Sequence, residues 1–72
     1  MQFTERFNYL LNANNITAYK LSKDTGIDQT LIGRWKVGKQ FPAMEKILQL
    51  ADYFNVSVDY LLGRTDKPEV NK

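Results

Sequence analysis

TAYKLSKDTGIDQTLIGRWKVG, the stretch from Thr17 to Gly38, decides the fold of this 72-residue chain. Thr17 is a residue type that caps the beginning of a helix, and Gly26 suits a turn where a positive φ is needed. Asp28 can cap a further helix, which would run to Val37 and stop at Gly38. The stretch therefore predicts two short helices joined by a glycine turn.

Small and apolar side chains fall on one side of each of these two helices. Ala18, Leu21 and Ser22 would face inward from the first, and Ile32 and Trp35 from the second. Ser22 must be small because the two helices would cross closely beside it. Trp35 can in principle stack on a sugar or a base, but a tryptophan at this spacing more often packs in a core. We expect the structural residues to be Leu21, Ser22, Ile27, Ile32 and Trp35.

Three further helices are predicted outside this stretch. The first would run from about residue 3 to 13, the fourth from about 44 to 54, and the last from 58 to 62. The expected inward side chains of the first helix are Phe3, Phe7, Leu10 and Leu11, and those of the fourth are Ile47, Leu48, Ala51 and Phe54. Ser57 would cap the last helix and Gly63 would end it. The expected fold is all-α, a compact five-helix bundle over residues 1–64, followed by a flexible tail or the start of a linker over 65–72.

Size and composition restrict the remaining possibilities. A chain of 72 residues is one small domain, and 43% hydrophobic with 25% charged residues is ordinary for a globular protein. The absence of cysteine and histidine excludes disulfides and the usual structural zinc sites, so we expect no metal and no cofactor. No apolar run approaches the roughly 20 residues of a membrane span and no secretion signal begins the chain, which predicts a cytoplasmic protein with no membrane partner.

The charge is small overall but unevenly distributed. The net charge is +2, yet residues 20–39 carry five basic against two acidic side chains, whereas residues 40–66 carry two basic against four acidic. Positive charge gathered on one unit is typical of a surface that binds nucleic acid. A solvated basic face with no such role is the simpler alternative.

Several of these residues, at their spacing in the chain, match the pattern of a known family. Residues 17–38 resemble the helix-turn-helix of the lambda-repressor-like, Cro/repressor-type (XRE-like) DNA-binding domains. The likeness continues through GKQFP and LADYFNVSVDYLLG, so it covers about residues 3–64. It implies sequence-specific binding of double-stranded DNA by a transcriptional regulator, a phage-type or bacterial repressor that is associated with the nucleoid through its DNA.

The resemblance also implies which residues read bases. They are the outward residues of the second helix of the motif, with Asp28 at its entrance: Gln29, Thr30, Gly33 and Arg34. Glutamine can bond adenine bidentately, arginine can bond guanine, and a threonine methyl group can contact thymine. Taken alone, Gln29 and Thr30 are ordinary soluble helix residues, and Arg34 has a phosphate or Asp28 as alternative partners.

Phosphate contacts are expected at the edges of the motif. The helix N-terminus at Thr17, Ala18 and Tyr19 presents backbone amides to a phosphate. At the far end of the second helix stand Lys36, Lys39 and Gln40, of which the lysines would set the salt dependence of binding. Lys46 reads as an ordinary surface lysine.

Three positions depart from the family pattern. Ala18 stands where the family often has a glutamine that contacts a phosphate, so only the backbone contact is expected there. Leu11 and Lys36 replace an arginine–glutamate pair that commonly joins helices one and three, which frees Lys36 for a phosphate. Gly33 replaces a larger polar residue, and it either permits close approach to DNA or removes one base contact.

One recognition helix reads only a few base pairs, so domains of this kind usually bind pseudo-palindromic operators as two-fold dimers. We expect a homodimer on DNA, with Tyr53, Val58, Tyr60 and Leu61 in or near the surface where family members often pair. A core position is the alternative for all four and the favoured one for Leu61. The chain would be either a complete small regulator or the DNA-binding part of a longer repressor.

Two other classes of function remain for comparison. An enzyme is not expected, because the chain has no histidine or cysteine, no paired carboxylates and no glycine-rich phosphate loop. A protein-interaction module is the stronger competitor, since this fold also occurs in antitoxins and coactivator-like proteins. An apolar patch on the recognition helix would favour that class, and Leu31, if exposed, is the residue that hints at it.

Overall fold

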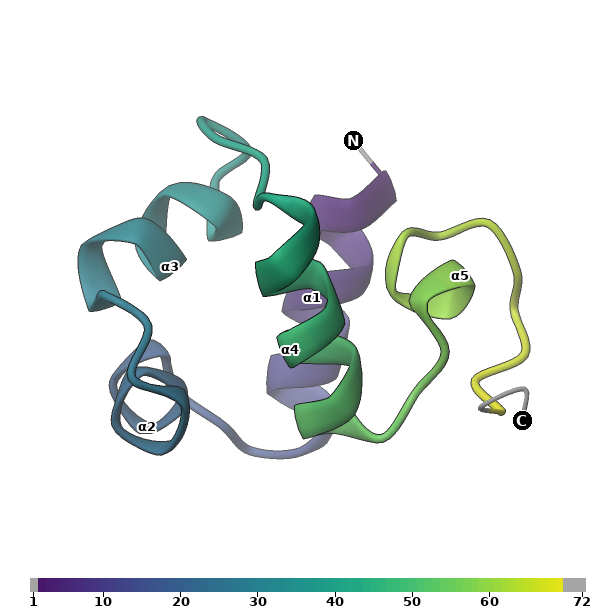
Figure 1. Cartoon of the computed structure of the whole chain (residues 1–72), viewed down its shortest axis with the longest axis horizontal. Helices are drawn as coiled ribbons and strands as arrows, with labels where there is room; N and C mark the ends of the chain where they lie inside the picture. The colour runs from purple at the N-terminus through teal and green to yellow at the C-terminus, as the bar shows by residue number, and fades with distance from the viewer. Residues whose placement is uncertain (1, 70–72) are drawn as a thin grey trace.

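The computed structural model describes residues 2–69, and across them the chain forms five helices and no strand. The helices are α1 (Gln2–Ala13), α2 (Ala18–Thr25), α3 (Gln29–Lys36), α4 (Met44–Phe54) and α5 (Val58–Leu61). Figure 1 shows α2 and α3 on one side of α1 and α4, with α5 on the other. The expected all-α, five-helix architecture is confirmed, and each predicted helix boundary lies within one residue of the observed one.

Local capping residues begin the three shortest helices, as predicted. The hydroxyl of Thr17 accepts from the Lys20 amide at 3.1 Å, and the carboxylate of Asp28 accepts from the Thr30 amide at 2.9 Å. Ser57 caps α5 in the same way, accepting from the Tyr60 amide at 3.0 Å. Each cap satisfies an amide that the first turn of a helix leaves without an internal partner. The beginnings of these helices are therefore fixed by the sequence next to them.

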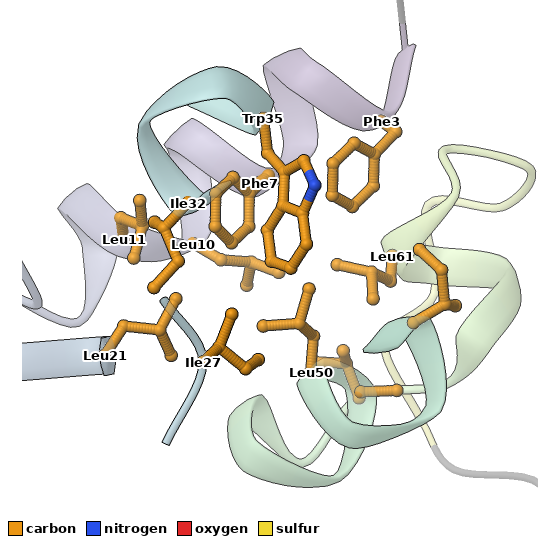
Figure 2. Packing of buried hydrophobic residues seen from close by; sticks show 13 residues of the cluster. Phe3, Phe7, Leu10, Leu11, Leu21, Ile27, Ile32, Trp35, Leu50 and Leu61 are labelled. Atoms are coloured by element: carbon orange, nitrogen blue, oxygen red, sulfur yellow. The ribbon is translucent and has the colours of Figure 1, made fainter. Parts of the chain in front are cut away.

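The core gathers around Trp35. Its indole ring is fully buried and meets the ring of Phe7 edge-on, with the two ring centroids 6.1 Å apart. Figure 2 shows Trp35 beside Phe3 and Phe7, with Leu50 and Leu61 close to the far edge of the indole. Side chains from α1, α4 and α5 thus meet at this tryptophan of α3, and the expectation that Trp35 packs in the core is confirmed.

One expectation for α4 is wrong. Leu48 was expected on the buried stripe, but 50% of it is exposed, and Leu50 is buried in its place. Ile47, Leu50 and Ala51 face the core because they lie three and four residues apart along a helix. Leu48 instead shares a row with Met44, one turn earlier and also exposed. The helix carries more apolar side chains than one buried face accommodates, so spacing alone did not select the row.

The segment after α5 lies against α1. The guanidinium of Arg6 donates to the carbonyl oxygens of Tyr60 at 2.8 Å and Thr65 at 3.2 Å, and it stacks over the Tyr60 ring at 3.9 Å from the centroid. It also pairs with Asp66 at 3.6 Å. Part of the predicted tail is thus in contact with the bundle, whereas residues 70–72 of that tail lie outside the described residues.

Candidate nucleic-acid interface

The two faces of α3 differ completely in exposure. Ile32 and Trp35 are fully buried, whereas Gln29, Thr30 and Arg34 are exposed. Because 3.6 residues make one turn, the exposed residues lie together on the face turned away from the core. Three of the predicted base-reading side chains are therefore brought together on one solvent-facing surface.

The turn before α3 is held by a short polar contact. The hydroxyl of Ser22 in α2 donates to the carbonyl oxygen of Ile27 at 2.6 Å, while Gly26 between them has a φ of +79°. Ile27 itself is buried. A small residue at position 22 thus has a bonding role in addition to the steric one expected from the sequence. The bond fixes the angle at which α3 leaves α2.

Asp28 is engaged at the beginning of α3. Because its carboxylate accepts from the Thr30 amide, it stabilises the helix end that would enter a groove. Its observed contact is structural, and a base contact by Asp28 remains a prediction.

Arg34 lies beside the residues expected at the far end of the motif. Its Nη1 atom is 3.5 Å from Oε1 of Gln40, a residue expected to meet a phosphate. The alternative pairing with Asp28 is not among the ion pairs of residues 2–69. Among residues 2–69 this long contact is the one hydrogen bond of the exposed guanidinium, so it is available to a ligand.

The lysines expected to meet phosphates are exposed at the end of α3. Lys36 and Lys39 both face solvent, and the backbone carbonyl of Lys36 accepts from Nδ2 of Asn8 at 2.8 Å. This bond joins α1 to the end of α3. Sequence reasoning missed it, because the two residues are 28 positions apart.

The beginning of α2 is equally accessible. Thr17 and Tyr19 are exposed and Ala18 is half-buried. The Thr17 hydroxyl takes up the third amide of the helix, and the first two amides have no partner within the helix itself. The three residues expected to present amides to a phosphate thus form an open helix end on the same motif as α3.

Two contacts attach the end of α2 to α4. The Tyr53 hydroxyl donates to the Asp24 carboxylate at 2.6 Å, and the Gln49 side chain donates to the Thr25 carbonyl at 2.9 Å. The Tyr53 bond, helped by Lys20 at 3.0 Å, lowers the pKa of Asp24 below its ordinary value. The same bond raises the pKa of Tyr53. These contacts position the motif, and no sequence pattern pointed to them.

None of the exposed large apolar side chains of residues 2–69 belongs to the recognition face of α3, by which we mean Gln29, Thr30, Gly33 and Arg34. They are Tyr9, Tyr19, Val37, Phe41, Met44 and Leu48. Leu31, which would have indicated a protein-binding α3 if exposed, is half-buried and packs against the core. The loop after α3 and the first two turns of α4 instead expose Phe41 by 49%, Met44 by 61% and Leu48 by 50%. We call these three side chains the apolar row. Its residues follow α3 in the chain, in the loop and the first two turns of α4 that Figure 1 shows leading on from the end of α3.

The residues expected at a dimer surface are largely used within the chain. Leu61 is fully buried, and Tyr53, Val58 and Tyr60 are half-buried against the core. Tyr53 is bonded to Asp24, and one face of Tyr60 is covered by Arg6. The core position favoured for Leu61 is confirmed.

Other kinds of site find little support in the described part of the chain. Residues 2–69 contain no group of three or more potential ligand side chains arranged to hold a metal ion. None of the helices within that range has the length and apolar character that crossing a bilayer requires.

Comparison with known proteins identifies relatives that are helix-turn-helix or transcriptional-regulator proteins. A family described as Helix-turn-helix matches residues 8–61. The chain is 32% identical over 63 residues to the HTH-type transcriptional activator BcrR of Enterococcus faecalis. It is 33% identical over 67 residues to YobD of Bacillus subtilis (strain 168), an uncharacterized HTH-type transcriptional regulator. It is 31% identical over 64 residues to the cryptic phage CTXphi transcriptional repressor RstR of Vibrio cholerae serotype O1.

The matches cover most of this chain but only part of each relative. They span 88%, 93% and 89% of the chain and 31%, 60% and 57% of BcrR, YobD and RstR respectively. No solved structure gave a significant match.

Proposed function

This chain belongs to the helix-turn-helix family of DNA-binding transcriptional regulators, and we propose that it binds a specific operator through the outer face of α3 and represses transcription. The family is one of regulators rather than enzymes, and the chain is not an enzyme. The observation that carries the proposal is the division of α3 into a buried face and an exposed polar face. A helix anchored on one side by Ile32 and Trp35 holds its other side rigidly enough to read base edges.

We assign base reading to Gln29, Thr30 and Arg34. The amide of Gln29 would bond adenine, the guanidinium of Arg34 would bond guanine, and the methyl group of Thr30 would contact thymine. Gly33 belongs to the same surface, and Asp28 acts at its entrance. Backbone positioning falls to the residues at the two ends of the motif: Thr17, Ala18, Tyr19, Lys36, Lys39 and Gln40.

Selection from a randomised duplex pool, followed by sequencing, tests this assignment. We expect Gln29→Ala and Arg34→Ala each to lose preference at one position of the selected site while the salt dependence stays close to that of the wild type. Lys39→Ala is the matched control, because loss of a phosphate contact should weaken binding to all sequences and reduce the salt slope. Weak and unselective binding that neither recognition-face substitution changes would contradict the proposal.

We further propose that the protein binds as a homodimer to a pseudo-palindromic operator. One α3 contacts too few base pairs to define a unique site, and two copies would read half-sites about one helical turn apart. The apolar row is the surface we assign to the second copy. It offers three exposed apolar side chains on the loop and helix that directly follow α3, so a two-fold contact there would place two recognition helices near each other.

Sedimentation analysis with and without operator DNA tests the dimer. Met44→Asp and Leu48→Asp should remove dimerisation and cooperative binding to the full operator, while a single half-site is bound with unchanged affinity. Lys46→Gln, on the same helix but outside the row, makes the net charge more negative by the same single unit and so separates a charge effect from loss of the contact. A variant that still forms dimers would move the interface to another surface.

Repression is the sign of regulation that we propose, since occupancy of an operator excludes polymerase without any further contact. A reporter gene placed behind the selected operator should be expressed less when the protein is present. Increased expression would assign activation instead. The cytoplasm, where operator DNA lies, is the location that this proposal requires.

A protein-interaction module is the second candidate, and the apolar row is the observation that favours it. On that alternative the row would bind another protein and α3 would contact no DNA. The duplex selection decides between the two, because only the regulator enriches a sequence.

A further inference from the structure

Gly33 has no role in the fold that requires a glycine. The other glycines, Gly26, Gly38 and Gly63, have φ values of 77–79°, which favour glycine. Gly33 lies inside α3 without a positive φ, and a Cβ atom built there would meet nothing within 4 Å. Alanine is the better helix former. For the isolated protein, therefore, alanine at this position would fit and would stabilise the helix.

Gly33, which destabilises the helix relative to alanine, lies on the recognition face. It is four residues after Gln29 and three after Thr30, so it lies directly above them on the same side of α3. Arg34 follows it, and the buried pair Ile32 and Trp35 faces the opposite way. The missing side chain therefore leaves a gap in the middle of the surface that we assign to DNA.

The width of the major groove explains how this gap could affect DNA binding. The major groove of B-DNA is about 12 Å wide, and an α-helix with its side chains has a diameter of about 10–12 Å. The clearance is small, so one side chain in the centre of the contact face determines how deeply the helix can enter. A glycine there lets the base pairs approach the helix backbone itself.

We propose that Gly33 sets the depth at which α3 enters the major groove, with the edge of a base pair lying against its Cα atom in the space of the absent side chain. This inference rests on the proposed function and names the residue that limits approach. Gly33 is a positioning residue: it brings Gln29 and Arg34 within reach of their bases. The alternative, that glycine only removes one contact, predicts no loss of affinity when alanine replaces it.

Gly33→Ala separates the two, because stability and binding should change in opposite directions. We expect the melting temperature to rise by about 4 °C, as an alanine in a helix interior predicts for a domain of this size. Affinity for the duplex selected with the wild type should fall about tenfold. Affinity for a scrambled duplex of equal length should not change, because phosphate contacts alone hold that complex. Gly33→Leu should lose more specific affinity than Gly33→Ala.

Tyr9→Ala is the matched control. Tyr9 is exposed on α1, beside Gly63 and Asp66 rather than α3, and its replacement changes no charge. It should bind both duplexes as the wild type does.

Two results would overturn the inference. Equal affinity of Gly33→Ala and wild type for the selected duplex means that no clearance is needed. An equal loss on the selected and scrambled duplexes means that the added methyl group meets the DNA backbone rather than a base edge. Failure of the wild type to select any sequence would instead contradict the proposed function, which keeps the two failures distinguishable.

Discussion

The inner and outer faces of α3 are built from different kinds of interaction. The inner face presents Ile32 and Trp35 to a core that, within the described residues, contains only apolar side chains. The outer face presents Gln29, Thr30 and Arg34 to solvent, and its one side-chain contact from Arg34 is 3.5 Å long. Stability and recognition are thus carried by opposite sides of one eight-residue helix. Substitutions on the two sides should have separable effects.

Truncating a buried side chain on the inner face of α3 should have the largest effect on the free energy of unfolding. Trp35→Ala leaves a cavity where α1, α3, α4 and α5 meet, and we expect it to cost about 3–5 kcal/mol in the free energy of unfolding. Much of the stability of a small domain would be lost. Urea denaturation followed by circular dichroism measures the change.

Trp35→Phe is the control for this prediction. The indole nitrogen of Trp35 is buried without a hydrogen-bond partner in the described structure, so phenylalanine removes volume but no bond. It should be less destabilising than alanine. If the alanine variant were as stable as the wild type, the inner face of α3 would not be the source of stability that we infer.

Loss of the outer face should leave stability unchanged and reduce binding. Because Arg34 is exposed, Arg34→Ala should unfold at the same urea concentration as the wild type. Its specific Kd should rise by about 5- to 150-fold, which corresponds to about 1–3 kcal/mol for a lost bidentate base contact. Fluorescence anisotropy with the selected duplex measures the Kd. A loss of stability equal to the loss of binding would show that the faces are not separable.

A substitution in the turn should affect both properties modestly. Ser22→Ala removes the bond from the Ser22 hydroxyl to the Ile27 carbonyl, which we expect to cost about 1 kcal/mol of stability. Because that bond orients α3, specific affinity should also fall, by less than in Arg34→Ala. Parallel denaturation and anisotropy measurements check both. Ser22→Thr, which keeps a hydroxyl group, tests whether bonding or size matters more.

The smallest effect should appear at extremes of pH. The lowered pKa of Asp24 contributes stability above its ordinary value of 3.8, and that contribution is lost as the pH falls through the lowered pKa. The raised pKa of Tyr53 contributes stability below its ordinary value of 10.0, lost as the pH rises through the raised pKa. Tyr53→Phe removes the shared bond, so its denaturation midpoint should depend less on pH at both ends. An unchanged profile would mean that this exposed bond contributes nothing to stability.

Much of the fold was predictable because its signals are local. Thr17, Asp28 and Ser57 each cap a helix within three residues of themselves, and such short-range bonds leave a clear pattern in a sequence. Leu48 was misplaced because the choice between neighbouring apolar rows depends on what packs against α4. That information is tertiary.

The exposed face of α3 was predictable from the sequence. The hydrogen bonds that hold α2 and α3 against the rest of the bundle were not. An exposed polar face on α3 follows from the burial of Ile32 and Trp35, which spacing indicated. The bonds that hold the motif join residues far apart in the chain: Tyr53 lies 29 positions from Asp24, and Asn8 lies 28 positions from Lys36. No periodicity connects such pairs. They could be found only once the helices had been placed in space.

The burial of Trp35 also equips the protein with an internal optical reporter. It is the only tryptophan of the chain, and it stands directly behind the recognition face without touching solvent. Its emission should therefore shift towards the red on unfolding, when water reaches the indole, and stay in place when a ligand binds to the outer face. A single unlabelled sample can thus distinguish a variant that is unfolded from one that is folded but has lost its affinity for the ligand.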